Sequence, residues 1–278
     1  GFLQAFSYLL RLRPRLIVSF GGYLAVPVVL AGWLLRIPSL THEQTVVAGW
    51  ANRAIAPFVD KIFLTHASSL SSYPKKKSLV VGLPLRPALF DPSLKKKFTP
   101  KLLYVSCGKQ GSHLINQTLF PIIPQLVKRF TIVHQTGAST INRDLDKARR
   151  LREPLGDLAG RYHYAPYFFA REAASYLQSA AVVVSRAGAH LTYELSLLQK
   201  RTVFIPISWV SHNEQLLNAV EAAKVAPAVI LAESELTPES LLAAIEKVEK
   251  MKPRVKVKAD PFAATNKILA VIHEYLQS

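Results

Sequence analysis

The stretch that decides the fold spans residues 181–218 and reads AVVVSRAGAHLTYELSLLQKRTVFIPISWVSHNEQLLN. Its residues 182–185 are small or β-branched, which predicts a short strand buried on both faces. Gly188 then interrupts the run and can adopt a backbone angle that other residues avoid. Residues 190–199 place leucines at helical spacing, and residues 202–207 form a second apolar run. This order predicts a βαβ unit whose helix begins at the carboxyl edge of a parallel sheet.

The start of this helix is a candidate anion site, because a helix N-terminus presents free N–H groups and a partial positive charge. Glu194 lies about one and a half turns further in, where a carboxylate can accept hydrogen bonds from sugar hydroxyls. Units of this kind also occur without a ligand, and an exposed glutamate on a helix is usually solvated. The spacing alone leaves both interpretations open.

Strand and helix patterns alternate over the rest of the chain, which predicts parallel sheets with helices on both faces. Residues 90–100 are polar, basic and proline-containing, as is typical of a linker. We therefore expect a domain boundary near residue 95. Residues 1–94 would form the first domain, residues 95–260 the second, and residues 261–278 a last helix that can pack back on the first.

The charge of the chain points to an anionic partner. The 278 residues carry a formal net charge of +17, and residues 1–100 hold 13 Lys and Arg against 3 Asp and Glu. An apolar, basic N-terminal part suits acidic lipid, and no nucleic-acid-binding module is recognisable, so nucleic acid is not expected. The lysine runs 75–77 and 95–97 are typical of solvated loops. The longest uncharged apolar run, residues 23–35, is too short to span a bilayer.

Three further features concern metals, thiols and phosphates. The only cysteine, Cys107, can form no internal disulfide. Asp144 and Asp146 have the spacing of a metal-binding pair, but the basic residues around them favour a solvated helix face, and we expect no metal. Lys109 and Ser112, in a glycine-rich turn that matches neither the dinucleotide fingerprint nor the P-loop, can reach a phosphate; the glycines could equally serve the turn alone.

Five segments, taken together, resemble one family in order and spacing. They are SFGGY at residues 19–23, HEQ at 42–44, GLPLR at 82–86, GKQG at 108–111, and SRAGA at 185–189 followed by Glu194. The chain thus resembles the MurG family of bacterial transferases, which add N-acetylglucosamine to an undecaprenyl-pyrophosphoryl-muramyl-pentapeptide lipid. The resemblance implies an α/β fold of the GT-B type, with two Rossmann-like domains that each hold a parallel sheet and face each other across a cleft.

The resemblance also implies roles for individual residues. The second domain would hold UDP-N-acetylglucosamine, with its diphosphate at the helix start, its ribose on Glu194 and its sugar on Gln215. The implied donor-binding residues are Arg86, Lys109, Gly188, Ala189, Glu194 and Gln215. The first domain would take the lipid acceptor, and the implied residues there are Gly21, Gly22, Tyr23, Glu43 and Thr45.

Some positions depart from the family pattern. No glycine-rich loop of the GGTGGH type precedes Phe2, so we expect an incomplete N-terminal domain without the family's catalytic base. His42 is the candidate base within this sequence, although a role in holding its loop is favoured. Thr45 and Lys109 stand where the family has asparagine and serine. The chain alone would then bind donor but transfer sugar poorly, and would need a missing N-terminal segment or a partner subunit.

The expected function is that of an inverting glycosyltransferase which uses UDP-N-acetylglucosamine and holds no cofactor or metal. Helix-start N–H groups would stabilise the departing UDP. One alternative is a glycolipid synthase that uses a UDP-sugar and diacylglycerol. Another is a donor-binding subunit or non-catalytic homologue. The resemblance places the chain at the cytoplasmic face of the bacterial inner membrane, bound peripherally to its anionic surface and to the undecaprenyl-linked acceptor.

Overall fold

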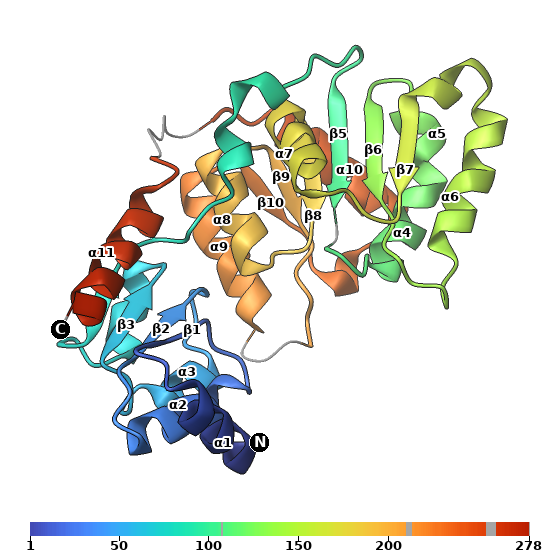
Figure 1. Cartoon of the computed structure of the whole chain (residues 1–278). Coiled ribbons are helices and arrows are strands. Elements are labelled where there is room, and N and C mark those ends of the chain that lie inside the picture. The colour runs from blue at the N-terminus through green and yellow to red at the C-terminus, as the bar shows by residue number, and fades with distance from the viewer. Residues whose placement is uncertain (107, 210–212, 254–259, 278) are drawn as a thin grey trace. The chain divides into compact units, whose positions relative to one another are not determined.

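The computed structural model describes residues 1–106, 108–209, 213–253 and 260–277, so Cys107 and His212 lie outside the described residues. The chain divides into two compact units. Unit 1 comprises Gly1–Leu85 and Asp260–Ser278, and unit 2 comprises Arg86–Ala259. Each unit is an α/β structure with its own parallel sheet (Figure 1).

Unit 1 is built on a sheet of four described strands, ordered β1-β2-β3-β4, and all three pairings are parallel. Its strands are β1 (Ile17–Ser19), β2 (Ser39–Glu43), β3 (Lys61–Leu64) and β4 (Ser78–Val80). Its helices are α1 (Phe2–Leu12), α2 (Ala25–Leu34), α3 (Trp50–Ile55), the 3-10 helix η1 (Ala67–Ser72) and α11 (Ala263–Gln277).

Unit 1 has a buried cluster of side chains on each face of its sheet. Successive side chains of β3 point to opposite faces and so enter different clusters. Ile62 and Leu64 pack against α2 and α3, together with Val29 and Ile55. Phe63, between them in sequence, lies in a separate cluster that contains Ile268 of α11. The last helix of the chain therefore covers the face of this sheet that α2 and α3 leave open (Figure 1).

Unit 2 contains six described strands, ordered β10-β9-β8-β5-β6-β7, and all of their pairings are parallel. The strands are β5 (Leu102–Ser106), β6 (Thr131–Gln135), β7 (Tyr162–Ala165), β8 (Val182–Ser185), β9 (Thr202–Phe204) and β10 (Ala228–Ile230). The α-helices are α4 (His113–Leu119), α5 (Ile123–Leu126), α6 (Asp144–Arg152), α7 (Ala170–Ser179), α8 (Ala189–Leu197), α9 (Glu214–Val225) and α10 (Pro238–Glu249). The 3-10 helices are η2 (Pro87–Phe90), η3 (Pro92–Leu94), η4 (Phe120–Ile122), η5 (Glu153–Arg161) and η7 (Glu233–Glu235).

The strand order of unit 2 is that of a doubly wound Rossmann sheet. Counted from β5, the chain first builds the sheet in one direction through β6 and β7, then returns and builds in the other direction through β8, β9 and β10. The direction reverses between β5 and β8, which pair directly along Leu103–Ser106 and Val182–Ser185. Ligands of open α/β sheets bind beyond the carboxyl ends of the strands at this reversal.

The two faces of this sheet carry separate cores. Leu103, Val105 and Val184 point into a cluster formed with α4, α5 and α10. Tyr104 and Val183, the intervening residues, point into a cluster formed with α7, α8 and α9. Both strands are thus buried on each face, as the uninterrupted apolar run at residues 182–185 predicts.

The prediction of a boundary near residue 95 differs from the observed division, which falls between Leu85 and Arg86. The reason is that residues 86–98 pack against α7. Leu89 is buried in the same core as Leu177. The Ser175 hydroxyl and the Gln178 amide also donate hydrogen bonds to backbone carbonyls of this segment. The polar, proline-containing stretch is therefore a packed part of unit 2 and not a free linker.

Candidate functional site: a polar cavity at the carboxyl edge of the unit 2 sheet

An open cavity of about 350 Å³ lies at the end of β5 in unit 2, where the sheet changes direction. Residues from the β5–α4 loop and from α8 meet in its lining. Its polar lining includes Arg86, Lys109, Gln135, His190 and Glu194, and its aromatic lining consists of Tyr104, Tyr167 and Phe168. The cavity thus brings together three of the residues predicted to bind the donor: Arg86, Lys109 and Glu194.

Arg86 and Glu194 form a two-point ion pair in this lining, although 108 positions separate them in sequence. The Nε and Nη2 atoms of Arg86 donate to Oε1 and Oε2 of Glu194 at 2.9 and 2.6 Å. The Glu194 side chain is only 3% exposed, so it is not the solvated helix residue of the alternative interpretation. Burial by itself lowers the pKa of Arg86, but the hydrogen bond and charge of Glu194 outweigh burial and raise it. The guanidinium of Arg86 is therefore held in its charged form.

The start of α8 lies beside this cavity. Gly188 is the N-cap residue, and Thr192 is the first residue whose N–H reaches back to its carbonyl. The N–H groups of Ala189, His190 and Leu191 therefore have no partner within the helix. Gly188 could adopt a backbone angle that other residues avoid, but its φ of −66° and ψ of 145° suit any residue. Among the described residues, a Cβ atom on Gly188 would meet no atom within 4 Å.

The β5–α4 loop approaches the cavity through tight glycine turns. Gly108 and Gly111 have φ values of 79° and 76°. A Cβ atom on Gly111 would come within 2.2 Å of the Thr136 carbonyl oxygen, so this position requires glycine. The Gln135 amide donates to the Gly108 carbonyl at 2.6 Å and fixes the loop. Lys109, between the two glycines, is exposed and contributes a cation to the cavity.

Gln215, predicted to bind the donor sugar, lies at the first turn of α9 and outside the lining of this cavity. Its Oε1 atom accepts hydrogen bonds from the backbone N–H groups of Ala187 and Ile207, at 3.3 and 3.1 Å. The side chain thus joins the loop after β8 to the loop after β9. The side-chain NH₂ group of Gln215, which offers two hydrogen-bond donors, takes no part in these two bonds.

Arg186 is a residue of this region that the sequence reasoning missed. It follows β8 and donates to Ser112 Oγ at 2.7 Å and to the Ile205 carbonyl at 3.0 Å. Its Nη1 atom also pairs with Glu233 Oε1 at 2.7 Å, and both side chains are largely buried. Glu233 in turn accepts from the backbone and hydroxyl of Ser208. Arg186 therefore connects the N-terminus of α4, the loop before α8 and the segment beyond β9.

Ser112 is consequently engaged in structure. Its hydroxyl accepts hydrogen bonds from Arg186 and from the Ile115 N–H, and caps α4. Burial alone would raise the pKa of Glu233, but the hydrogen bonds from Ser208 and Arg186 outweigh it and lower the pKa. The buried carboxylate stays charged opposite Arg186. The signal that could have identified Arg186 is a lone arginine directly after a fully apolar strand, where a buried cation needs a partner.

The predicted acceptor residues belong to unit 1. Gly21 and Gly22 have φ values of 80° and 79°, so the loop after β1 requires glycine at both positions. At Gly21 a Cβ atom would also come within 2.9 Å of the Asn52 amide. Tyr23 and Leu24, which follow, are 88% and 82% exposed. This loop therefore presents large apolar side chains to its surroundings.

Glu43 and Thr45 are held in a hydrogen-bonded loop of unit 1. Glu43 is 3% exposed. Its Oε1 atom accepts from the N–H and hydroxyl of Thr45, and its Oε2 atom accepts from Gly49 and from Tyr73. Burial, then the hydrogen bond to Glu43, raises the pKa of Tyr73 far above its usual value, so the phenol keeps its proton. In this conformation both residues shape the loop between β2 and α3.

His42 lies inside unit 1, at 1% exposure, with its ring edge-on to Phe20 and Phe63. Its Nε2 atom lies 3.0 Å from the Gly82 carbonyl oxygen and 3.2 Å from the Thr65 hydroxyl. A general base must come within hydrogen-bond reach of the proton that it removes, directly or through one water. The burial of His42 favours the role of holding its loop.

Asp144 and Asp146 do not share a solvated face. The prediction of a solvated helix face is wrong for Asp144, which is buried and lies 2.9 Å from His113 Nδ1 and 2.8 Å from the Asn116 amide. Asp146 is exposed and pairs with Arg143. Within the described residues, no group of three or more His, Cys, Asp or Glu side chains is placed to hold a metal ion.

Two family models match the chain. The glycosyltransferase family 28 C-terminal domain matches residues 102–274, and the N-terminal domain of the same family matches residues 1–64. A relative from Clostridium kluyveri is 31% identical over 99% of this chain and 78% of its own length. A relative from Bacillus cereus is 29% identical over 98% of this chain and 76% of its own length. Both carry the name UDP-N-acetylglucosamine–N-acetylmuramyl-(pentapeptide) pyrophosphoryl-undecaprenol N-acetylglucosamine transferase, with the number 2 added for the second.

Solved structures agree with the GT-B prediction. Acinetobacter baumannii MurG matches 98% of this chain and 77% of its own, with a TM-score of 0.71 and 24% identity. A Methanocaldococcus jannaschii UDP-GlcNAc 2-epimerase, solved with UDP-GlcNAc and UDP, matches 98% of this chain and 79% of its own, with a TM-score of 0.64 and 11% identity. The family matches, the strand order of the sheets and these structures agree, and the chain belongs to glycosyltransferase family 28, within its MurG group.

Proposed function

We propose that this chain transfers N-acetylglucosamine from UDP-N-acetylglucosamine to an undecaprenyl-pyrophosphoryl-linked muramyl pentapeptide, with inversion at the transferred sugar. The names of the Clostridium kluyveri and Bacillus cereus relatives support this assignment. They favour neither the glycolipid synthase nor the non-catalytic homologue considered from the sequence.

The observation that carries the proposal is the cavity of unit 2. It combines an aromatic wall of Tyr104, Tyr167 and Phe168 with the cations of Lys109 and Arg86. A nucleotide base can stack on aromatic side chains, and a diphosphate is stabilised by cations and by the free N–H groups of a helix start. The cavity volume of about 350 Å³ lies at the small end of the range for ligand pockets. These features suit a nucleoside diphosphate sugar.

We place the diphosphate at the start of α8, beside Gly188 and Ala189. No atom of the described residues lies within 4 Å of a Cβ atom built on Gly188, which leaves room for a phosphate oxygen to approach the backbone. As the bond from the sugar to the diphosphate breaks, negative charge grows on the leaving UDP. Fixed N–H dipoles stabilise that charge without reorganisation. The absence of a protein-bound metal stays a prediction.

Glu194 keeps the role of ribose ligand in this proposal, but with Arg86 as its support. A carboxylate offers about four lone-pair sites, and Arg86 uses two of them. The remaining sites can accept hydrogen bonds from the two ribose hydroxyls. Gln215 would bind the sugar through its amide donors, because its oxygen already accepts from Ala187 and Ile207.

We assign acceptor binding to unit 1, with Gly21, Gly22 and Tyr23 as direct contacts and with Glu43 and Thr45 shaping the neighbouring loop. Exposed backbone at paired glycines leaves room for a bulky ligand to approach. His42 supports this region from inside the unit. The acceptor hydroxyl needs a base that contacts it directly or through one water, a role that the buried position of His42 does not favour.

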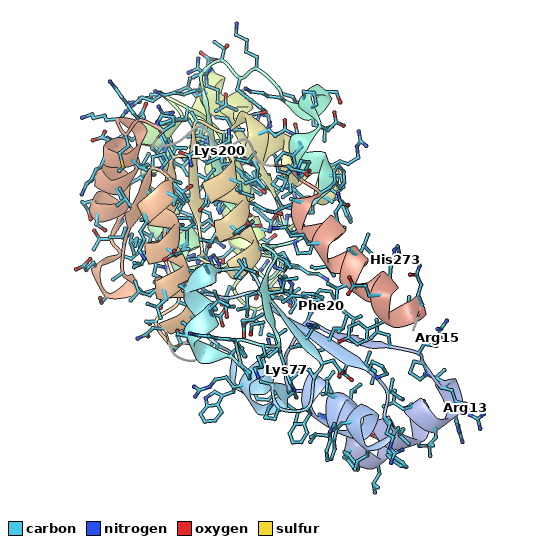
Figure 2. All side chains as sticks on the ribbon, turned by 90° about the vertical axis from the view of Figure 1, so that its left-hand side faces the viewer. Arg13, Arg15, Phe20, Lys77, Lys200 and His273 are labelled. Atoms are coloured by element: carbon cyan, nitrogen blue, oxygen red, sulfur yellow. The ribbon has the colours of Figure 1, made fainter. Side chains whose placement is uncertain are left out.

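We further propose that unit 1 binds peripherally to an anionic membrane surface. Within the described residues, no helix combines the length and apolarity needed to cross a bilayer. On α2, Val29 and Ala31 are buried, whereas Trp33 and Leu34 are exposed. The exposed arginines of unit 1 are Arg11, Arg13, Arg15, Arg36 and Arg53, and Figure 2 shows Arg13 and Arg15 at one edge of the unit. Exposed apolar side chains with arginines suit acidic lipid.

Two measurements test the proposed function. Calorimetric titration with UDP-N-acetylglucosamine, UDP and ADP should show saturable binding of the two uridine compounds and weaker binding of ADP. No heat of binding for UDP at millimolar concentration would remove the donor assignment. In a second assay, labelled N-acetylglucosamine should appear in a muramyl-pentapeptide lipid. Label that appears in diacylglycerol instead would establish the glycolipid alternative.

A further inference from the structure

A second cavity, of about 470 Å³, lies on unit 2 away from the donor site. It is lined by residues just before β5 and at the end of α7, among them Lys95, Lys97, Lys101, Phe98 and Ser179. Strand β5 begins at this cavity and ends at the donor cavity. Because a strand of five residues is about 17 Å long, the two cavities are separate.

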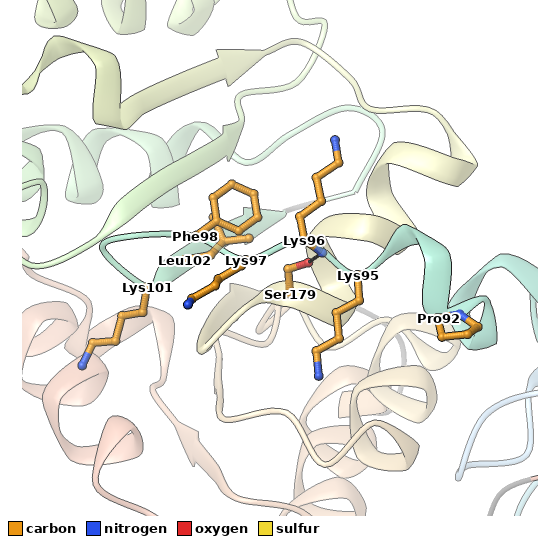
Figure 3. Close-up of a pocket in the computed structure, with 8 residues that line it drawn as sticks. All are labelled: Pro92, Lys95, Lys96, Lys97, Phe98, Lys101, Leu102 and Ser179. Carbon is orange, nitrogen blue, oxygen red and sulfur yellow. Dashed lines mark hydrogen bonds between the residues drawn. The ribbon is translucent and has the colours of Figure 1, made fainter.

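Lysines dominate the lining of this second cavity. In Figure 3, the side chains of Lys95, Lys97 and Lys101 extend toward the same side of the chain, whereas Lys96 extends away from them. Phe98 and Leu102 supply the apolar part of the lining. The run 95–97, which sequence alone predicts to be a solvated loop, is exposed but bounds a hollow.

The positive charge of this hollow is only partly neutralised. Within the described residues, no carboxylate lies within 4.0 Å of the amine of Lys95 or Lys97. Lys101 pairs with Glu249, but that carboxylate also accepts from Arg129 at 2.8 Å. The cavity therefore carries an excess of cationic groups over anionic ones.

Lys95, a lining residue of this cavity, also acts on the largely buried amine of Lys200. Its amine donates to the carbonyls of Gln178 and Ala180 and so caps the end of α7. Burial, followed by the charges of Lys95 and Arg201, lowers the pKa of Lys200 to about 8. The two cations thus raise the electrostatic potential at a neighbouring buried group, which a bound anion would relieve.

We propose that Lys95, Lys97 and Lys101 form a second anion-binding site, separate from the donor cavity, that takes a ligand bearing one or two phosphate groups. Ammonium groups bind phosphate oxygens through charge-assisted hydrogen bonds. The apolar lining suits the non-phosphate part of such a ligand. Its source can be a free phosphate compound or the headgroup of an anionic lipid, which share this chemistry.

The chain offers a matched control for this site. Lys75 and Lys76 lie in a second lysine run, in unit 1, and are exposed. Lys77 is left unchanged because its amine donates to the carbonyls of Pro57 and Val59 (the residue is labelled in Figure 2). The double variants K95Q/K97Q and K75Q/K76Q therefore remove the same charge from different places.

The test is calorimetric titration of the full chain with inorganic pyrophosphate, in excess UDP so that the donor cavity is filled. The wild-type protein and K75Q/K76Q should bind pyrophosphate, and K95Q/K97Q should bind it at least tenfold more weakly. Unchanged UDP affinity in both variants shows that the fold is intact. If UDP does not bind the wild type, the proposed function is contradicted but the second site is not. The pyrophosphate titration of the three proteins is then repeated without UDP.

Vesicles of phosphatidylglycerol distinguish the two sources of phosphate. A larger loss of vesicle binding in K95Q/K97Q than in K75Q/K76Q assigns the site to a lipid headgroup, and pyrophosphate binding without such a loss assigns it to a free phosphate compound. Both outcomes support the site. Equal behaviour of the two double variants toward pyrophosphate and toward vesicles overturns it.

Discussion

The guanidinium of Arg86 and the carboxylate of Glu194 meet in two hydrogen bonds of 2.9 and 2.6 Å in the lining of the unit 2 cavity that we propose for the donor. Arg86 is the first residue of the unit, and Glu194 lies in the middle of α8. The pair therefore connects the first residue of unit 2 to α8, the helix at whose start we place the diphosphate. A substitution at either residue acts on both.

The Arg86–Glu194 pair should give non-additive effects on donor affinity. Glu194→Ala removes the proposed ribose ligand and should weaken UDP binding by roughly 1.5–3 kcal/mol. Arg86→Ala should weaken it by a similar amount. The double variant should lose less than the sum of the two single losses, since each single variant leaves a partner without its counter-charge. A calorimetric double-mutant cycle measures this, and strictly additive losses would show that the two residues act independently.

Residues 86–259 should bind UDP as an isolated fragment. Both cores of unit 2 lie entirely within this range, and so do the proposed donor residues. A fragment that begins at residue 95 lacks Arg86 and the packing of Leu89 against α7, and should bind more weakly and unfold at a lower temperature. Calorimetry and thermal unfolding compare the two fragments. Equal affinity of the two fragments for UDP would exclude Arg86 from the donor site.

Arg186 should be a positioning residue for the diphosphate. The variant Arg186→Met combined with Glu233→Gln breaks the connection to Ser112 without leaving a buried charge unpaired. Affinity for UDP should fall several-fold more than affinity for uridine, because only UDP uses the N–H groups of the helix start. Arg129→Met, which removes the ion pairs of Arg129 with Glu246 and Glu249, serves as the control. Equal losses for UDP and uridine would indicate a purely structural role.

Vesicle binding should depend on exposed apolar residues of unit 1. Leu12 and Leu24 are 72% and 82% exposed, so changing both to serine should reduce co-sedimentation with acidic vesicles without unfolding the unit. The matched control changes the exposed Ile141 and Trp209 of unit 2 to serine. Binding by the wild type should also decrease with added salt, because salt screens the arginine charges. Equal loss in both double variants would contradict a membrane face on unit 1.

His134 should make unit 2 less stable in acid. The residue is buried, and burial lowers its pKa to about 3 against an ordinary value of 6.5, with Asp144 acting weakly in the opposite direction. Below pH 6.5, His134 binds a proton in the unfolded chain but stays neutral in the folded chain. The free energy of unfolding should therefore fall by about 1 kcal/mol per pH unit as the pH drops below 6.5. Urea unfolding of the wild type and His134→Gln from pH 4 to 7 checks this, and identical slopes would exclude His134 as the cause.

The strands and helices around the donor cavity follow from local patterns. The apolar run at 182–185 and the leucines after it correspond to β8 and α8, because a strand buried on both faces needs no polar alternation. The observed ends differ slightly: the second strand, predicted at 202–207, is β9 at Thr202–Phe204. The resemblance also pointed to Arg86, Lys109 and Glu194, which share one cavity lining.

What the local patterns could not provide were contacts between distant segments. Nothing near Glu194 in sequence indicates that Arg86 neutralises it, and nothing near Arg186 indicates Glu233. The buried position of Asp144 depends on His113 and Asn116 from another helix. Gly188 does not use the backbone freedom that the sequence offers it: its φ of −66° is ordinary, and a Cβ atom there would meet no atom of the described residues within 4 Å, so nothing in the described structure itself requires glycine at this position.

This last point gives the most direct test of the central claim, that the diphosphate of the donor lies at the start of α8. Gly188→Ala adds one methyl group where no atom of the described residues lies within 4 Å and where φ and ψ suit alanine. Alanine is a poorer N-cap than glycine but lowers the entropy of the unfolded chain, so the variant should stay folded with a stability near that of the wild type. Gly160→Ala, at another glycine with no atom within 4 Å of its Cβ position, is the control. The measurement is the affinity for UDP-N-acetylglucosamine by calorimetry. We predict at least a tenfold loss for Gly188→Ala and none for Gly160→Ala; wild-type affinity in Gly188→Ala would contradict the account.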